Sequence, residues 1–321
     1  MAPEIAVVVA SHDRPLRLRW LLEALADQTL ARDRFEVVVA HDSSGAETDQ
    51  LLEDHALARA GTLRHVRRDP GSSPPGANRN AAWRAAQAPI VAFTDDDCRP
   101  PREWLANALR AAQRHPGAIV QGATQPDPDE HRLLYAPVHH KQNIAPPTAW
   151  AQTCNIVYPR AVLERLNGFD ERRLVGEDAA LAAAARAHGI DYVGEPDVLT
   201  YHAVVPVPLP RFLRSLHRWE DLPLLVKEHP EMRRHFPLGL FWKWTHAWLP
   251  LALLGAALAR RTSFLSLLLA LPWAKTSLPW YGPGKRNLVF RLRQAPRRLA
   301  IDATEMAVLA RGSLRHRAPL L

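Results

Sequence analysis

Strand-like runs alternate with helical patterns through residues 4–202. The runs at 4–10, 35–40 and 90–93 are rich in β-branched residues and contain few charges, as strands buried on both faces of a sheet do. The first run leads into a pattern that begins near Pro15 and repeats apolar residues every three or four positions, which is typical of an amphipathic helix. The alternation predicts an α/β fold.

Further runs of both kinds complete this part of the chain. A Pro-rich stretch at 124–150 fits neither pattern and contains the adjacent His139 and His140, so we expect a long loop there. Further strands are expected at 62–67, 118–122, 153–158, 190–193 and 198–202, and further helices after residue 45, at 77–87, from 100 onward, at 159–166 and at 179–188.

Two apolar runs, at 244–259 and 262–273, are separated by Arg260 and Arg261. As helices they would extend about 24 Å and about 18 Å, less than the hydrocarbon core of about 30 Å. We therefore expect helices that lie on or dip into one membrane leaflet, while a soluble hairpin packed on the core is the alternative. The tryptophans expected near the lipid headgroups are Trp242, Trp244, Trp248, Trp273 and Trp280.

Positive charge gathers in the same part of the chain. The formal net charge is +8, and residues 259–321 contain twelve basic and two acidic residues. Basic residues beside an interfacial segment are attracted by anionic lipid, whereas a nucleic-acid partner would be expected with a recognisable recognition fold. We therefore expect an anionic membrane surface, and no nucleic acid, as a partner.

Composition narrows the class of protein. Hydrophobic residues make up 47% and charged residues 23% of the chain, as in an ordinary globular protein rather than a disordered one. Cys98 and Cys154 are too few for a disulfide framework and lack metal-type spacing. The start of the chain shows no signal-peptide pattern. We expect a cytoplasmic protein, peripherally or monotopically associated with the inner face of the cell membrane.

The run at 90–93 ends in three consecutive carboxylates, Asp95, Asp96 and Asp97. Ligands of open α/β sheets bind beyond the carboxyl ends of the strands. Adjacent acids repel one another, so a folded site that contains them needs a cation or hydrogen-bond donors. A solvated acidic turn that caps a helix is the alternative.

Five ordered motifs, together with this acidic triplet, resemble a family 2 glycosyltransferase with the type-A (GT-A) nucleotide-sugar-binding fold, over residues 4 to about 202. The resemblance implies a Rossmann-like mixed sheet flanked by helices. Asn78 stands where the family usually has Ala, and the glycine spacing before it is shorter. The motifs are Ser11-His12-Asp13-Arg14-Pro15, His41-Asp42-Ser43-Ser44-Gly45, Gly76-Ala77-Asn78-Arg79-Asn80, Gly168-Phe169-Asp170 and Gly176-Glu177-Asp178.

The resemblance implies a role for each residue at the donor. Asp42 would read a uracil N–H, and its alternative is a turn or helix cap. Arg79 would meet diphosphate oxygens or an acidic neighbour, and its alternative is a surface arginine. The other residues implied for nucleotide-sugar binding are Ser11 and Arg14, Asp95 at the ribose, and Asp96, which has the weakest claim of the three acids.

The resemblance also implies a metal site and a base. Asp97 would bind Mn²⁺ or Mg²⁺, which take oxygen ligands, and His202 would be a further ligand unless it is structural. Asp178, at the start of a helix that favours its charged form, would be the general base, unless it is an ordinary first-turn residue.

Three residues are weaker candidates for the acceptor side: Glu177, Arg218 and Trp219. The last two lie in Ser215-Leu216-His217-Arg218-Trp219, which resembles the Gln-x-x-Arg-Trp motif of processive polysaccharide synthases. Ser replaces Gln here, which argues against a polymerising enzyme. A helix packing seam is the alternative.

Together these features predict an inverting, divalent-metal-dependent glycosyltransferase. It would move one sugar from a nucleotide-sugar donor, expected to be a UDP-sugar, to a carbohydrate, lipid-linked or small-molecule acceptor hydroxyl at or near the membrane surface. The alternatives are a nucleotidyltransferase, disfavoured because residues 11–15 contain no glycine, and a non-catalytic membrane-bound sugar or nucleotide binder. The expected regions are a catalytic domain at 1–205, a helical connector at 206–235 and an apolar, basic helical region at 236–321 that associates with the membrane.

Overall fold

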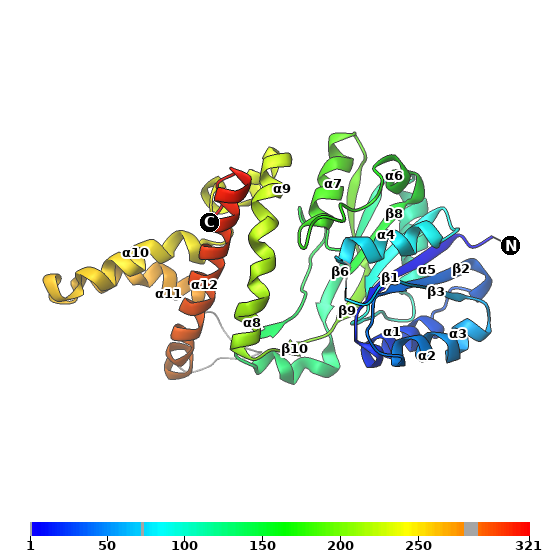
Figure 1. Cartoon of the computed structure of the whole chain (residues 1–321), viewed down its shortest axis with the longest axis horizontal. Coiled ribbons are helices and arrows are strands. Elements are labelled where there is room, and N and C mark those ends of the chain that lie inside the picture. Colours follow the sequence, from blue (N-terminus) through cyan, green and yellow to red (C-terminus); the bar gives the residue numbers. More distant parts are fainter. Residues whose placement is uncertain (1, 72–73, 279–287) are drawn as a thin grey trace. The chain divides into compact units, whose positions relative to one another are not determined.

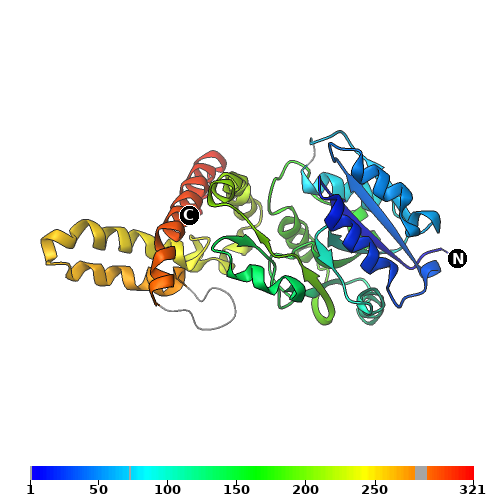
Figure 2. The same ribbon diagram turned by 90° about the horizontal axis from the view of Figure 1, so that it is seen from below.

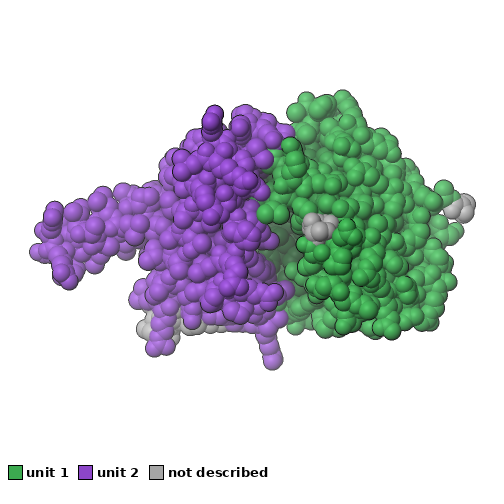
Figure 3. Space-filling view, in the orientation of Figure 1, with its two compact units in different colours: residues 1–130, 141–204 green, residues 131–140, 205–321 purple. Residues whose placement is uncertain are grey.

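The computed structural model describes residues 2–71, 74–278 and 288–321. The chain divides into two compact units (Figure 3). The first comprises Met1–Glu130 and Lys141–Val204, and the second comprises His131–His140 and Val205–Leu321. The second unit thus takes in a short segment from the stretch that was expected to be a loop, and the three regions expected from the sequence stay a prediction.

The first unit is built on an eight-stranded mixed sheet of order β3-β2-β1-β4-β8-β6-β9-β5 (Figure 1). Strands β1 to β4 are parallel neighbours, whereas β8 runs antiparallel to both β4 and β6. This confirms the predicted α/β class. The strands are β1 (Ile5–Ser11), β2 (Phe35–His41), β3 (Leu63–Arg67), β4 (Ile90–Asp95), β5 (Cys98–Arg99), β6 (Ile119–Pro126), β8 (Asn155–Pro159) and β9 (Tyr192–His202).

Helices cover both faces of this sheet, because successive strand residues point to opposite faces. On one face Val37 and Val39 pack with α1, α2, α3 and α5, and on the other Val38 and Phe93 pack with α4, α6 and α7. The helices are α1 (Pro15–Ala26), α2 (Glu47–Asp54), α3 (Ala56–Arg59), α4 (Pro75–Ala85), α5 (Trp104–Arg114), α6 (Arg160–Arg165) and α7 (Glu177–Ala187), with the 3-10 helix η1 (Arg32–Arg34).

Two sequence-based expectations are wrong in detail. The runs at 190–193 and 198–202 form one strand, β9, which pairs with β6 across a register shift after Gly122. Asn155 occupies that irregularity by donating to the carbonyls of Ala123 and Val198, each at 2.7 Å. The expected loop at 124–150 contains the end of β6, the 3-10 helix η2 (Pro128–Tyr135) and β7 (His139–His140).

The second unit is helical apart from a two-stranded ladder of β7 and β10 (Val205–Pro206). Its long helix α12 (Leu288–His316) packs on η3 (Leu216–Asp221), where His316 Nε2 lies 3.3 Å from Asp221 Oδ1. The remaining helices of this unit are α8 (Leu209–Ser215), α9 (Leu222–Glu228), η4 (Pro230–His235), η5 (Pro237–Gly239), α10 (Trp244–Leu258), η6 (Ala259–Thr262), η7 (Leu265–Ala270) and α11 (Leu271–Ser277).

Residues 244–277 form a hairpin that extends away from α12 within this unit (Figures 1 and 2). The second apolar run is not one helix, because Ser263 and Phe264 adopt positive φ angles and η7 precedes the short α11. Over the described residues, none of the helices is both long and apolar enough to cross a bilayer. The exposed large apolar side chains of the hairpin are Trp244, Leu251, Leu253, Leu254, Phe264, Leu265, Leu267, Leu268, Leu269 and Leu271.

A buried polar cluster fixes the base of this hairpin to α12. His246 Nε2 lies 3.1 Å from Glu305 Oε2, and Asp302 accepts hydrogen bonds from Thr245 and from the Trp273 indole, at 3.1 and 2.9 Å. The expectation that Trp273 lies near lipid headgroups is therefore wrong, since its ring is buried against a carboxylate that needs the indole N–H. Trp280 lies outside the described residues.

Candidate active site

Three parallel strands end at one edge of the sheet and bring the predicted donor residues together. In the ladders of β1, Ser11 is opposite His41 of β2, and Ala10 is opposite Asp95 of β4. The segments that follow β2 and β4 therefore start on either side of the end of β1. This edge is where an open α/β sheet binds its ligands.

Asp42 is only 2% exposed, although it follows the last residue of β2. Its Oδ1 accepts a hydrogen bond from Asn78 Nδ2 at 3.0 Å, and His12 Nδ1 lies at the same distance. The next helix begins at Glu47 with Ala46 at its N-cap, so Asp42 does not cap it. The structure thus presents a buried, oriented carboxylate, and its base-binding role stays a prediction.

Asp96 lies inside the site rather than pointing away from it. Ser11 Oγ donates to Asp96 Oδ2 at 2.8 Å, and one Arg14 nitrogen reaches Asp96 Oδ1 at 3.3 Å and Asp97 Oδ2 at 2.8 Å. Burial raises the pKa of Asp96 to about 7, although the Arg14 charge opposes the rise and Asp97 adds to it. Asp96, which had the weakest claim of the three acids, is therefore a buried member of the site.

The residues around Asp97 fit a divalent cation. Asp97 Oδ1 lies 3.3 Å from His202 Nε2, and Asp97, His202 and Cys98 can each offer an atom within 4.8 Å of the others. His202 Nδ1 lies 2.9 Å from the Ala203 carbonyl, a contact that fixes the proton on Nδ1 and leaves the Nε2 lone pair toward Asp97. Carboxylate and imidazole together suit Mn²⁺.

Cys98 lies near Asp97 and His202, but its thiol is not suited to bind the same cation. Its thiol is buried with Ile144 and Cys154 and donates to the Cys154 carbonyl at 3.6 Å. Burial, assisted by the neighbouring Cys154, raises the pKa of the Cys98 thiol well above its usual value. A protonated thiol is a poor ligand for a hard cation. Both cysteines are free and buried.

Arg79 is a buried bridge between two carboxylates, not a surface arginine. It donates to Glu177 Oε1 at 2.6 Å and to Asp95 Oδ1 at 3.2 Å. Burial opposes its charge, but the carboxylates of Asp95, Glu177 and Asp178 raise the pKa of Arg79 overall. This pairing joins the end of β4 to the start of α7. The predicted acceptor-side role of Glu177 and the predicted diphosphate contact of Arg79 stay predictions.

Asp178 lies in the first turn of α7, after Gly176, whose φ of 79° requires the left-handed region that glycine tolerates. Its Oδ1 accepts from the Ala179 N–H at 2.8 Å. Burial and the adjacent Glu177 raise the pKa of Asp178 to about 8, against the opposing charge of Arg79. The helix start alone therefore does not keep this carboxyl ionised, contrary to the expectation from its position.

Asn80 is a positioning residue that the sequence analysis did not single out. Its side chain donates to the Phe169 carbonyl at 2.8 Å and accepts from the Phe169 N–H and from the Trp83 indole, each at 2.9 Å. These bonds fix the Gly168-Phe169-Asp170 turn to α4. Its place beside Arg79 in a shared motif was the one available signal.

Arg218 and Trp219 belong to the second unit, in η3. Arg218 is exposed, and its guanidinium lies 5.7 Å from the centre of the Trp219 ring, which in turn packs against Trp242 at 5.2 Å. These contacts fit a helix packing seam. The acceptor-side role of both residues stays a prediction.

Curated relatives resemble this chain over part of their length. The validoxylamine A glucosyltransferase of Streptomyces hygroscopicus subsp. jinggangensis is 27% identical over 223 residues, which cover 59% of this chain and 52% of that protein. The poly(ribitol-phosphate) beta-N-acetylglucosaminyltransferase TarS of Staphylococcus aureus is 30% identical over 117 residues, which cover 36% of this chain and 20% of that protein. The chain thus spans about half the length of the first relative. It spans about a fifth of the length of the second.

Solved structures share the fold. The mannosyltransferase PcManGT from Pyrobaculum calidifontis, in complex with GDP-Man and Mn²⁺, has a TM-score of 0.58 at 20% identity, covering 99% of this chain and 88% of that one. S. aureus TarS 1-349 in complex with UDP has a TM-score of 0.54 at 18% identity, covering 98% and 92%. Both likenesses support a GT-A-like fold.

The sequence comparison confirms the predicted resemblance. Residues 6–165, from β1 into α6, match the family model described as glycosyl transferase family 2. That range includes Asp42, Arg79 and the three adjacent acids, which the structure places at one sheet edge. Residues 6–165 of the chain belong to glycosyl transferase family 2.

Proposed function

We propose that the chain transfers one sugar from a UDP-sugar to an acceptor hydroxyl, with inversion at the anomeric carbon and with a bound divalent cation. The observation that carries the proposal is the meeting of three acidic segments at one place. Asp42 follows β2, Asp95–Asp97 follow β4, and Arg79 joins Asp95 to the start of α7, where Asp178 lies.

Asp42 would bind the base of the nucleotide-sugar donor. The Asp42 carboxylate is oriented by Asn78 and can accept the N–H of a uracil ring. TarS, which shares the fold, binds UDP and UDP-GlcNAc, while PcManGT binds GDP-Man, so nucleotide-sugar binding is compatible with this architecture. A guanine base also presents N–H donors to a carboxylate, so the choice of uracil rests on the family resemblance of the Asp42 motif.

Asp97 and His202 would hold the cation, and Mn²⁺ or Mg²⁺ fit their oxygen and imidazole donors. When bound, the cation neutralises the charge that develops on the diphosphate as the glycosidic bond breaks, and its positive charge favours ionised Asp178. Arg14, which pairs with Asp97 here, is free to turn toward the phosphates in that state.

Asp178 acts as the general base. The acceptor oxygen attacks the anomeric carbon on the face opposite the diphosphate, its proton moves to the Asp178 carboxylate, and the bond from that carbon to the phosphate oxygen breaks. The products are a glycoside of inverted configuration and UDP. Arg79 keeps Glu177 paired, so Asp178 is the carboxylate of α7 that remains available for the proton.

Substitution of Asp178 by Asn tests this assignment. Asp178→Asn should lower the rate of sugar transfer at least about 100-fold, since general-base catalysis contributes about 10² to 10⁴, while UDP binding by calorimetry stays within a few-fold. Asp197→Asn, an exposed Asp on β9, is the matched control and should keep full activity. A folded Asp178→Asn variant that has lost UDP binding would contradict the role of base.

A donor screen tests the rest of the proposal. Nucleotide sugars are screened for binding and for turnover with and without Mn²⁺, and the released product is identified. UDP release that stops with EDTA and returns with Mn²⁺ or Mg²⁺ supports the proposal. Transfer that needs no metal removes the role of Asp97, and release of pyrophosphate from UTP and a sugar phosphate would instead indicate a nucleotidyltransferase.

We also propose that the acceptor is met at the inner face of the cell membrane. In the apolar hairpin, 70% of the surface of Leu265 is exposed to solvent, and further leucines are exposed beside it. The neighbouring α12 is rich in basic residues. Apolar area beside positive charge is the combination that binds anionic lipid surfaces. A carbohydrate, a lipid-linked sugar and a small molecule all remain open as acceptors.

A further inference from the structure

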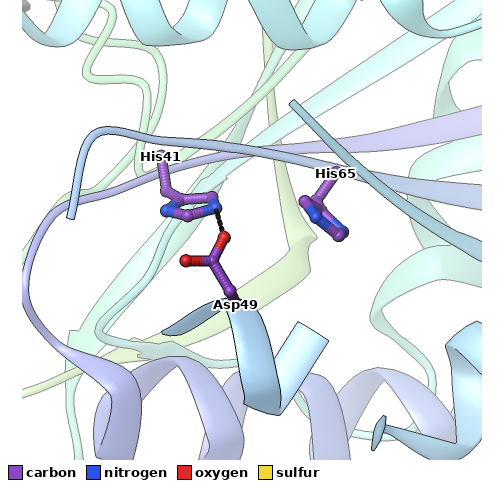
Figure 4. A group of neighbouring side chains, drawn as sticks. All are labelled: His41, Asp49 and His65. Carbon is purple, nitrogen blue, oxygen red and sulfur yellow. Dashed lines mark ion pairs between the residues drawn. The ribbon is translucent and has the colours of Figure 1, made fainter. Parts of the chain in front are cut away.

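Two histidines and an aspartate meet on the sheet face that α2 covers (Figure 4). His41 ends β2, His65 lies on the neighbouring β3, and Asp49 reaches them from α2. His41 Nε2 lies 3.2 Å from Asp49 Oδ1, and the two imidazole centres are 5.9 Å apart. One ligand atom from each side chain falls within 4.8 Å of the others.

His41 is the unusual member of this group. Its side chain is fully buried, and neither ring nitrogen has a hydrogen-bond partner among the described residues. The 3.2 Å contact with Asp49 therefore lacks hydrogen-bond geometry. Buried polar atoms normally find partners, so two unsatisfied nitrogens in one ring suggest that a missing partner completes the group.

The groups around the cluster favour metal binding by both the His41 imidazole and the Asp49 carboxylate. Burial lowers the pKa of His41, although Asp49 opposes the shift, so the neutral ring that can donate a lone pair is favoured. The other oxygen of Asp49 is held by Arg67, so Oδ1 is directed at His41 while Oδ2 is neutralised. Metal-bound carboxylates are commonly held by such an outer partner. Arg67 also limits the carboxylate to one metal bond.

We propose that His41, Asp49 and His65 form a binding site for a divalent transition-metal ion of the zinc type, separate from the Asp97 group. Two imidazoles and one carboxylate suit Zn²⁺ or Co²⁺ better than Mg²⁺ or Ca²⁺. The ion would join β2, β3 and α2, and its ligand His41 directly precedes Asp42 in the chain. Its binding stabilises the folded first unit, because the three ligands meet only there.

The test measures metal binding by the full-length chain after removal of metals. Zn²⁺ is titrated in competition with a chromogenic chelator, and Co²⁺ is followed by its visible absorption. His65→Ala removes a partly exposed ligand and should weaken one Zn²⁺ equivalent at least about 100-fold, since even outer partners contribute about 10- to 100-fold. It should also abolish the rise in melting temperature that Zn²⁺ causes in the unsubstituted chain.

Two controls separate this site from others. His188→Ala, at the C-cap of α7, removes an exposed histidine whose Nδ1 lies 2.8 Å from the Ala184 carbonyl, and it should leave Zn²⁺ binding unchanged. His202→Ala disrupts the Asp97 group and should retain the equivalent that His65→Ala loses. The buried group of His246, Asp302 and Glu305 is intact in every variant, so it cannot account for a difference between them.

Equal Zn²⁺ affinity and equal thermal stabilisation in the unsubstituted chain and in folded His65→Ala would overturn the proposal. If near-ultraviolet circular dichroism shows that His65→Ala does not fold, Asp49→Asn replaces it. That variant keeps the side-chain shape but offers a neutral oxygen, so weaker binding supports the site and unchanged binding contradicts it.

Discussion

Asp178 is a carboxyl group whose surroundings oppose the charge its role requires. Its pKa rises from an unfolded value of about 3.9 to about 8 in the folded chain because of burial and Glu177. A carboxyl group whose folded pKa is raised contributes its stability fully below pH 4 and loses it as the pH rises toward 8. The free energy of unfolding should therefore fall over that range in the absence of divalent cations.

Asp178→Asn should remove this loss. The variant should gain stability relative to the unsubstituted chain as the pH rises from 4 to 8, and the gain should reach at least about 1.4 kcal/mol, the equivalent of one pKa unit. Urea unfolding at several pH values measures it. Asp197→Asn should show no such trend, and a difference for Asp178→Asn that stays constant with pH would contradict the argument.

Arg79 is a buried basic residue that pairs with both Glu177 and Asp95. Arg79→Met keeps most of the side-chain length but leaves Glu177 and Asp95 without their partner. Breaking a buried ion pair from one side costs about 3 to 5 kcal/mol, and we expect a loss in this range in urea unfolding of the first unit at pH 7.

Arg84→Ala is the control for that loss. Arg84 lies on the same helix as Arg79 but is exposed, and its contact with Glu171 is 3.4 Å long. Exposed pairs contribute about 0 to 1 kcal/mol. Similar losses for the two variants would show that Arg79 contributes through ordinary helix packing instead of through its two carboxylates.

The sequence patterns predicted the positions of the strands and helices well, but they did not predict the contacts between these elements. The buried strands β1, β2 and β4 show their period directly, and the resemblance supplied Asp42, Asp95, Asp97 and Asp178 as a set. The bridge from Arg79 to Glu177 joins residues 98 positions apart, and no local pattern contains such a contact. The same limit hid the pairing of His139 and His140 with Val205 and Pro206.

The turn before α7 illustrates what a single glycine does for an element. Gly168 has a φ of 71°, and a Cβ there would lie 2.3 Å from Asn80 Oδ1. Gly168→Ala should therefore combine strain of about 1 to 2 kcal/mol with about 1 to 3 kcal/mol of overpacking. Thermal unfolding of the variant measures the sum.

Gly189→Ala separates the two contributions. Gly189 has a similar φ of 74°, but nothing lies within 4 Å of the place where a Cβ would be. It should lose only the strain, so Gly168→Ala should be the less stable variant by at least about 1 kcal/mol. Equal losses would mean that Asn80 moves aside and does not hold the turn.

The two units contribute different chemistry to the molecule as a whole. The first gathers the acids of the candidate donor site, and the second gathers exposed leucines and basic residues. A hairpin of 34 residues, 244–277, with its base fixed by buried polar bonds to α12, can present leucines without unfolding. Either lipid or a second copy of the chain could cover such a surface.

Vesicle flotation distinguishes these two occupants. The double variant Leu265→Asp/Leu268→Asp should float with anionic vesicles at least about 100-fold less than the unsubstituted chain, since two buried leucines contribute about 3 kcal/mol or more. Leu314→Asp is the matched control: Leu314 is 82% exposed on α12, outside the hairpin, and its loss should leave flotation unchanged. High salt should weaken binding to anionic vesicles, because the basic residues add attraction that salt screens.

Flotation that is equal for all variants would contradict membrane insertion of the hairpin. A concentration-dependent dimer that only the double variant abolishes would assign the leucines to a second copy of the chain.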